Sequence, residues 1–239
     1  MARDIILVHG SAHTGECWDL LRPELTRRGF VVHTPTLGGH RGNPRVPLAT
    51  TMRTYGDDVL AVAQEIGEPS ILLGHSMGGF VISEAAERAP RLVSNMVYLT
   101  AFVPAFGRSS MTRVAPASPM LAKSSKFHWN GAITFPGDAA KTLFYNRCTP
   151  EIQDYAVRLL SPQPIRAAVS SITVTEAALG SIRKQYIECT DDNALPLSSQ
   201  RTMQSYMPFE RVESIDSDHS SFYSMPETLA QVIDRITTG

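Results

Sequence analysis

Apolar residues gather in short continuous runs in the first part of the chain. Residues 5–8, with the sequence Ile-Ile-Leu-Val, form one run, and residues 71–73 and 96–99 form two more. A shorter run lies at residues 31–32. Continuous runs of this length are typical of strands that are buried on both faces of a parallel sheet. The pattern therefore predicts four strands in the first hundred residues.

Amphipathic stretches lie between these runs. Apolar residues at helical spacing predict helices over residues 18–28, 55–66 and 80–89, and the second of these is expected to end at Gly67. Residues 36–48 are rich in Gly, Pro and Arg and predict a long loop. Strands that alternate with helices in this way indicate a parallel sheet with right-handed crossovers and helices on both faces.

The alternation stops in the middle of the chain. Between residues 102 and 182 we find no convincing buried strand and expect loops and helices, such as a helix over 151–160. It resumes with strands at residues 186–187 and 211–215 and with helices at residues 198–206 and 227–236. We predict a doubly wound α/β core formed by residues 1–101 and 183–239, with a helical cap inserted at 102–182.

Composition narrows the choice of partners. The 239 residues carry a net charge of −1, and 43% are hydrophobic, which is ordinary for a globular protein and gives no reason to expect a nucleic acid or a membrane as partner. Cys17, Cys148 and Cys189 lack CxxC spacing, which argues against a disulfide framework and against a zinc site. The apolar run at 5–8 is too short for a signal peptide, so we expect a cytoplasmic protein.

The strongest chemical signal is the sequence Gly-His-Ser-Met-Gly at residues 74–78. It follows a predicted strand and opens a predicted helix, which is the context that a nucleophile elbow requires. Glycines two residues before and after the serine permit close approach of the strand and the helix, and the helix N-terminus favours developing negative charge. We predict that Ser76 is the nucleophile of a serine hydrolase.

A serine hydroxyl needs a base to remove its proton. In the α/β-hydrolase fold, which the nucleophile elbow predicts, the base and its acid follow the serine along the chain. Only His128 and His219 follow Ser76, and His219 comes directly after the last predicted strand, where the base belongs. The acid is expected just after the preceding strand, where Asp191 and Asp192 are adjacent. Spacing alone does not separate these two aspartates.

An oxyanion hole needs two N–H donors. One is expected from the backbone of Met77, the residue after the nucleophile, and the other from the loop that follows the first strand, where we choose Ser11. His9 and His13 of the same loop are expected to be structural, with their rings bonded to nearby carbonyls.

The motifs taken together resemble the plant methyl esterase and hydroxynitrile lyase family, which includes the salicylate-binding methyl esterase and bacterial relatives. The segments that carry the resemblance span nearly the whole chain: residues 8–13, Trp18, and residues 74–79, 100–104, 148–151, 186–196 and 218–219. The Cys-Thr-x-Asp pattern of the esterases matches Cys189 to Asp192, so the resemblance implies Asp192 as the catalytic acid.

Two departures from the lyase branch point to ester hydrolysis. That branch carries a threonine where this chain has Gly10 and a lysine where it has Ser220, and these groups are thought to serve the cyanohydrin reaction. The esterase branch commonly has alanine at the position of Ser11, so the surroundings of the oxyanion hole are more polar here.

The cap supplies apolar residues that are expected to line part of a pocket for a small ligand, and about half of them are expected to form only the cap core. They are Phe102, Met111, Met120, Leu121, Phe127, Trp129, Phe135, Leu143 and Phe144. Arg113, Lys123 and Lys126 form either a polar entrance or a solvated surface. The residues expected to contact substrate are Gly10, His75, Phe102, Trp129 and Ser220.

We therefore predict a serine carboxylesterase that uses no cofactor and no metal and acts on a small apolar or aryl ester, with methyl esters among the candidates. The alternatives are a hydroxynitrile lyase-like or other non-hydrolytic enzyme, a biosynthetic thioesterase or cyclase, and a small-ligand receptor that retains the triad. The sequence is compatible with a homodimer.

Overall fold

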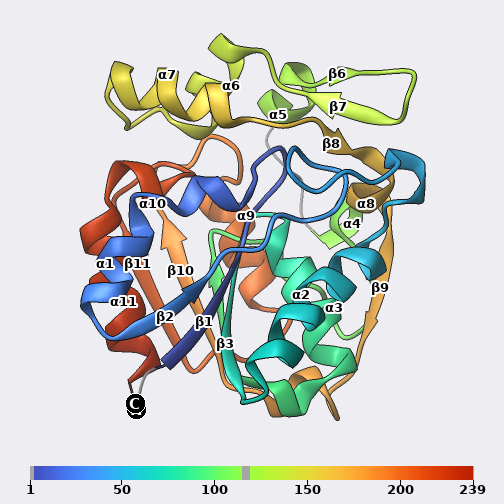
Figure 1. The fold of residues 1–239 in the computed structure, drawn as a ribbon, viewed down its shortest axis with the longest axis vertical. Helices are drawn as coiled ribbons and strands as arrows, with labels where there is room; N and C mark the ends of the chain where they lie inside the picture. The colour runs from blue at the N-terminus through green and yellow to red at the C-terminus, as the bar shows by residue number, and fades with distance from the viewer. Residues whose placement is uncertain (1–2, 115–118, 239) are drawn as a thin grey trace.

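A six-stranded parallel sheet forms the centre of the protein in a computed structural model, which describes residues 3–114 and 119–238 (Figure 1). The strands lie in the order β11-β10-β4-β3-β1-β2, and every neighbouring pair is parallel. Their bounds are β1 (Arg3–Val8), β2 (Phe30–His33), β3 (Ser70–His75), β4 (Val93–Leu99), β10 (Lys184–Cys189) and β11 (Arg211–Ile215). The predicted doubly wound α/β fold is confirmed.

The apolar runs form strands because both of their faces are buried. In β1, Ile6 and Val8 pack into one core cluster and Ile5 and Leu7 pack into another, on the opposite face of the sheet. All six residues of β3 are buried as well. A parallel sheet with helices on both faces needs continuous apolar strands of this kind, which explains why the sequence signal was clear.

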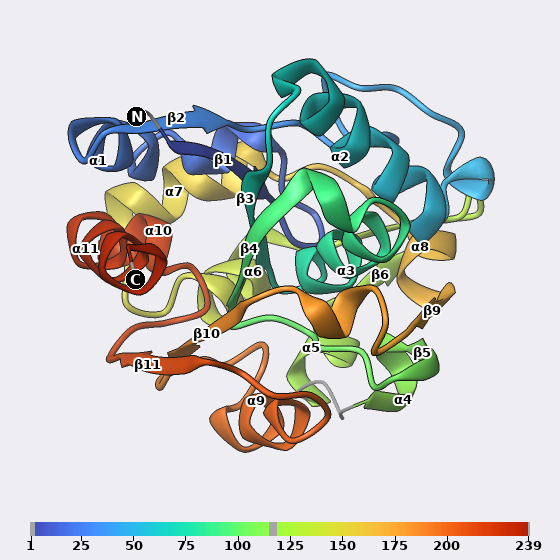
Figure 2. The same cartoon turned by 90° about the horizontal axis from the view of Figure 1, so that it is seen from below.

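Helices cover both faces of the sheet, as Figure 2 shows from below. One face packs against α1 (Leu21–Arg27), α10 (Ser221–Ser224) and α11 (Pro226–Thr237). The other packs against α2 (Met52–Ile66), α3 (Gly78–Arg88) and α9 (Leu197–Gln204). The helix expected over 18–28 is a short 3₁₀ turn followed by α1, and α2 ends at Gly67 with φ +77°. The 3₁₀ turns are η1 (Gly15–Trp18), η2 (Pro47–Ala49), η3 (Pro90–Leu92) and η4 (Leu179–Ser181).

The segment between β4 and β10 lies over the carboxyl ends of the strands and along one side of the core (Figure 1). Its helices are α4 (Met111–Val114), α5 (Pro119–Ser124), α6 (Gly137–Phe144), α7 (Pro150–Leu159) and α8 (Ile165–Val169). The helix expected over 151–160 corresponds to α7.

The expectation that this segment lacks strands is wrong. It contains two small antiparallel sheets, β5-β9 and β6-β7-β8. Their strands are β5 (Gly107–Ser110), β6 (Lys126–Phe127), β7 (Ala132–Thr134), β8 (Gln163–Pro164) and β9 (Ser171–Val174). Strands of two to four residues produce too short an apolar pattern to be recognised. None of the described helices is long and apolar enough to cross a membrane.

Candidate active site

Ser76 lies in a tight turn between β3 and α3, at the carboxyl edge of the sheet. Its φ is +54°, a left-handed conformation that side chains other than glycine rarely adopt. The flanking glycines are required by close contacts: a methyl group on Gly74 would lie 2.5 Å from the Gly78 carbonyl oxygen, and one on Gly78 would lie 2.5 Å from the Val8 carbonyl oxygen. The turn therefore has the steric character expected of a nucleophile elbow.

His219 and Asp192 meet at the same edge of the sheet. The Nδ1 of His219 donates to Oδ2 of Asp192 at 2.6 Å, and both side chains are almost fully buried. The same carboxylate accepts from the Thr100 hydroxyl on Oδ2 and from the backbone N–H groups of Ala194 and Leu195 on Oδ1, at 2.7 and 2.8 Å. Four donors match the acceptor capacity of an ionised carboxylate. Because Nδ1 donates, Nε2 of His219 is free to accept a proton in the neutral ring.

The neighbouring Asp191 has different surroundings. Its Oδ2 lies 3.2 Å from Nη1 of Arg147 on the surface, and the side chain is about half exposed. The structure thus brings Asp192, and not Asp191, to His219, which is the choice that the family resemblance implied and that spacing left open.

His75 connects the nucleophile turn to the histidine loop. Its Nε2 donates to the backbone carbonyl of His219 at 2.9 Å, and the two imidazole rings are 4.5 Å apart between centroids. Burial lowers the pKa of His75 well below its usual value of 6.5, and neighbouring histidines lower it further. A neutral His75 next to Ser76 is consistent with a structural role in holding the His219 loop against the turn.

The two expected oxyanion donors lie side by side. The Ser11 hydroxyl contacts the Met77 sulfur at 3.5 Å. Within the part of the chain that the structure describes, neither backbone N–H of this pair has an acceptor in the protein. Gly10 lies directly against Ser76, since a methyl group there would be 2.7 Å from Ser76 Cβ. Two free N–H groups next to a strained serine are the arrangement that would stabilise an oxyanion.

Backbone strain is concentrated at this edge of the sheet. Among the described residues, the only ones other than glycine with positive φ are Ala12 (+62°), Ser76 (+54°) and Thr100 (+35°). Ala12 follows the expected oxyanion donor Ser11, and Thr100 donates to Asp192. Strained conformations of this kind cluster at functional sites because the surrounding structure has to hold them in place.

The residues expected to contact substrate have mixed surroundings. Phe102 is 8% exposed and its N–H donates to the Ser76 carbonyl at 3.0 Å, which places its backbone beside the nucleophile. Ser220 is buried next to His219, and its hydroxyl has no partner among the described residues. The side chain of Trp129 is 99% exposed in the turn between β6 and β7, so it does not line an enclosed pocket, and its contact with substrate stays a prediction.

The cap residues expected to line the pocket divide into two groups. Phe144 of α6 is buried, with its ring 5.6 Å from His219 and 5.1 Å from Phe135, so aromatic side chains do lie against the histidine. Phe127, at 70% exposed, and Met120, at 39%, face solvent instead. Composition alone does not separate such exposed apolar residues from those that line a pocket.

Two residues with structural roles at the site escaped the sequence analysis. The sequence places Thr100 only in the segment 100–104 that carries the family resemblance and does not predict its bond to Asp192. Asp218, which the sequence places only in the segment that resembles the family, is fully buried, and its carboxylate accepts from the Arg147 and Ser220 N–H groups and from the Ser224 hydroxyl. Burial raises the pKa of Asp218. It ties the His219 loop to the segment that precedes α7.

Within residues 3–114 and 119–238, no group of three or more His, Cys, Asp or Glu side chains is arranged to hold a metal ion. The fold and the geometry described above are those of an α/β hydrolase. The family model described as "Alpha/beta hydrolase family" matches residues 5–232, and the chain belongs to this family.

Its relatives include hydrolases and esterases. A pyrethroid hydrolase from Sphingobium wenxiniae is 32% identical over 96% of this chain and 86% of its own length. Methyl jasmonate esterase 1 from Vitis vinifera is 28% identical over 98% of this chain and 96% of its own length. A crystal structure of a pyrethroid hydrolase superposes with a TM-score of 0.86 at 30% identity, covering 99% of this chain and 97% of that one. The resemblance to esterases that the motifs indicated is confirmed, and the chain is an enzyme of the esterase and hydrolase class.

Proposed function

We propose that the protein is a serine carboxylesterase that hydrolyses a small, largely apolar or aryl ester through Ser76, His219 and Asp192. The observation that carries the proposal is the buried His219–Asp192 pair at 2.6 Å, on the same sheet edge as a strained serine and two free N–H groups. Each part of this arrangement has a defined task in acyl transfer.

The reaction would proceed in two stages. His219 Nε2 takes the proton of the Ser76 hydroxyl as Oγ attacks the ester carbonyl carbon, and the N–H groups of Ser11 and Met77 bind the resulting oxyanion. When the tetrahedral intermediate collapses, the bond to the alkoxy oxygen breaks, and the leaving alcohol takes the proton from His219. A water molecule then gives a proton to His219 and attacks the acyl carbon. The bond between this carbon and Ser76 Oγ breaks, which releases the acid, and Oγ takes the proton from His219.

The substrate class is inferred from the surroundings of His219 and from the relatives. Phe144, which packs in turn against Phe135, places an aromatic ring beside His219, and this favours apolar or aryl groups over charged ones. Relatives are named for pyrethroid and methyl jasmonate hydrolysis, so aryl and methyl esters are the substrates to test first. Absence of a cofactor, a cytoplasmic location, a homodimer and the division into core and cap stay predictions from the sequence.

The close approach of Gly10 to Ser76 favours hydrolysis over cyanohydrin cleavage. A threonine, the residue of the lyase branch at this position, would place its Cβ 2.7 Å from Ser76 Cβ in this backbone geometry. The thioesterase and cyclase alternatives share all the features above and are separated from an esterase only by substrate preference.

The test is an activity screen of the purified protein on methyl esters, p-nitrophenyl esters, acyl thioesters and a cyanohydrin, with Ser76→Ala as the matched control. We expect ester turnover, labelling of the wild type by a fluorophosphonate, and loss of both in Ser76→Ala with an unchanged circular dichroism spectrum. Full ester turnover by Ser76→Ala would rule out the mechanism. Preference for a thioester or a cyanohydrin would replace the proposed substrate class, and tight binding of an ester without turnover would indicate a receptor.

A further inference from the structure

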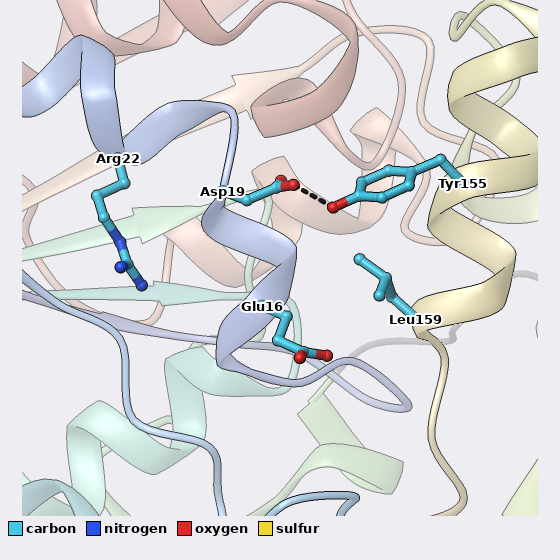
Figure 3. A pocket seen from close by; sticks show the side chains of 5 residues that line it. All are labelled: Glu16, Asp19, Arg22, Tyr155 and Leu159. Atoms are coloured by element: carbon cyan, nitrogen blue, oxygen red, sulfur yellow. Dashed lines mark hydrogen bonds between the residues drawn. The ribbon is translucent and has the colours of Figure 1, made fainter.

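The segment between α6 and α8 is attached to the loop that carries the expected oxyanion donor. The hydroxyl of Tyr145 donates to Nε2 of His13 at 2.9 Å, at the end of that loop. Further along, the Tyr155 hydroxyl donates to Asp19, at a hollow of about 310 Å³ between α7 and the start of α1 (Figure 3). These bonds hold the segment between α6 and α8 against the loop and the start of α1. Two further bonds, from Ser161 and Gln163, are made to the backbone of Ala12.

Gln163 of β8 makes the most extensive of these contacts. It is fully buried, its Oε1 accepts from the Ala12 N–H at 3.1 Å, and the same oxygen lies 3.2 Å from His40 Nε2. Its Nε2 donates to the Pro164 carbonyl at 2.9 Å and to the Tyr55 hydroxyl at 3.2 Å. The orientation of the amide is determined, because the Ala12 N–H can only donate and the Pro164 carbonyl can only accept.

Both backbone polar groups of Ala12 are held by this segment. While Gln163 accepts from its N–H, the N–H of Ser161 donates to its carbonyl at 2.8 Å. Ala12 has φ +62°, a conformation that alanine does not favour by itself, so its neighbours must impose it. Ser11 directly precedes Ala12, and the direction of the Ser11 N–H depends on the orientation of the backbone at this turn.

We propose that Gln163 is a positioning residue that sets the oxyanion hole by holding Ala12 in its left-handed conformation. This inference rests on the proposed function, because it assigns a role to the Ser11 N–H as an oxyanion donor. It also gives the segment 145–164 a role in catalysis, because the position of this segment determines whether the Ser11 N–H points at the reacting carbonyl. Gln163 acts through Ala12 and touches no reacting atom.

A purely structural role for this buried amide would give a different result. In that case its loss would destabilise the whole fold, but the enzyme that stays folded would react at the normal rate. A positioning role instead lowers the rate of the chemical step, while substrate binding changes little. Measurements of kcat, KM and thermal stability on the same variants therefore distinguish the positioning role from the structural one.

The experiment compares Gln163→Met, which keeps the side-chain size but removes both polar groups, with Gln163→Glu, which keeps an oxygen acceptor for Ala12. Tyr55→Phe is the matched control, because it removes one partner of the same amide and leaves the bond to Ala12 in place. The readouts are kcat and KM on a p-nitrophenyl ester, the rate of inactivation by a fluorophosphonate, and the melting temperature. If Gln163→Met fails to fold, Gln163→Asn, whose shorter side chain withdraws the amide from Ala12, takes its place.

We expect Gln163→Met to lower kcat and the inactivation rate at least about tenfold with KM nearly unchanged, a part of the roughly 10²–10³-fold loss caused by removing an oxyanion donor outright. Gln163→Glu is expected to recover most of the rate, and Tyr55→Phe to keep it. An unchanged kcat in folded Gln163→Met, or an equal loss in Tyr55→Phe, would overturn the inference. If instead the wild type itself hydrolyses no ester, the proposed function has failed.

Discussion

Lowering the pH below neutrality is expected to destabilise this protein through three buried histidines at its active site. His9, His13 and His75 are each no more than 3% exposed. The hydrogen bonds of His13 are those of a neutral ring, since Nδ1 donates to the Ser11 carbonyl and Nε2 accepts from Tyr145. A proton added to such a ring has to displace a donor in a buried site.

The size of the effect follows from the pKa of His13. Burial is the main cause that lowers this pKa from 6.5 to about 4; the bond to the Ser11 carbonyl opposes the shift, and His219 and His40 contribute to it. A depressed pKa favours the neutral form in the fold, so the contribution to stability is fully present above pH 6.5 and is lost as the pH falls through 6.5 towards 4. A shift of this size corresponds to about 3 kcal/mol.

His9 and His75 act in the same direction. The pKa of each lies well below the usual value, with burial as the first cause and neighbouring histidines as a further one. Each buried histidine adds a slope of up to about 1.4 kcal/mol per pH unit to the free energy of unfolding. Since a domain is stable by only about 5–15 kcal/mol, we expect acid unfolding close to pH 5.

The assay is urea unfolding followed by circular dichroism at several pH values between about 8 and 5, with the slope of the free energy against pH as the readout. His13→Asn is expected to reduce the slope by up to about 1.4 kcal/mol per pH unit below pH 6.5. Phe144→Leu is the control, because its ring packs 5.6 Å from His13 but does not titrate, so it should lower stability equally at every pH. A flat stability over this range, or an unchanged slope in His13→Asn, would refute the reasoning.

Four further substitutions test the geometry of the site. Gly10→Ala is expected to lower kcat strongly, because its methyl group would lie 2.7 Å from Ser76 Cβ; unchanged kinetics would contradict that contact. Asp192→Asn should lower kcat by about 10⁴, as loss of a triad acid does, whereas Asp191→Asn should leave it nearly intact, and the reverse order would exchange their roles. Trp129→Ala should leave kcat/KM unchanged, because the side chain is 99% exposed; a large rise in KM would indicate that it contacts substrate.

The core of the fold was predictable from sequence because its strands are buried on both faces. The run at residues 5–8 is apolar at every position, which only a central strand or a buried helix requires. The short sheets of the inserted segment were missed for the opposite reason. β6 consists of Lys126 and Phe127, both exposed, and pairs with β7 without any apolar periodicity of its own.

Site residues that belong to a local sequence pattern were predicted, and those that depend on contacts with distant parts of the chain were missed. Ser76 and His219 were recognisable because a local turn pattern and the order along the chain identify them. Thr100 and Gln163 act on Asp192 and Ala12, which lie 92 and 151 residues away in sequence. No local pattern records such a contact, so only the folded chain reveals it.

The strained residues at the sheet edge depend on partners from other segments. The N–H of Ser76 donates to the Leu99 carbonyl at 3.3 Å, and the N–H of Thr100 donates to the Ile187 carbonyl at 2.8 Å. Ala12 is held by the segment above the sheet. Strain that is maintained by separate neighbours is released wherever one neighbour moves away, before the sheet itself opens. The catalytic geometry should therefore be less stable than the fold, and a gradual rise in urea should abolish ester turnover before it unfolds the central sheet.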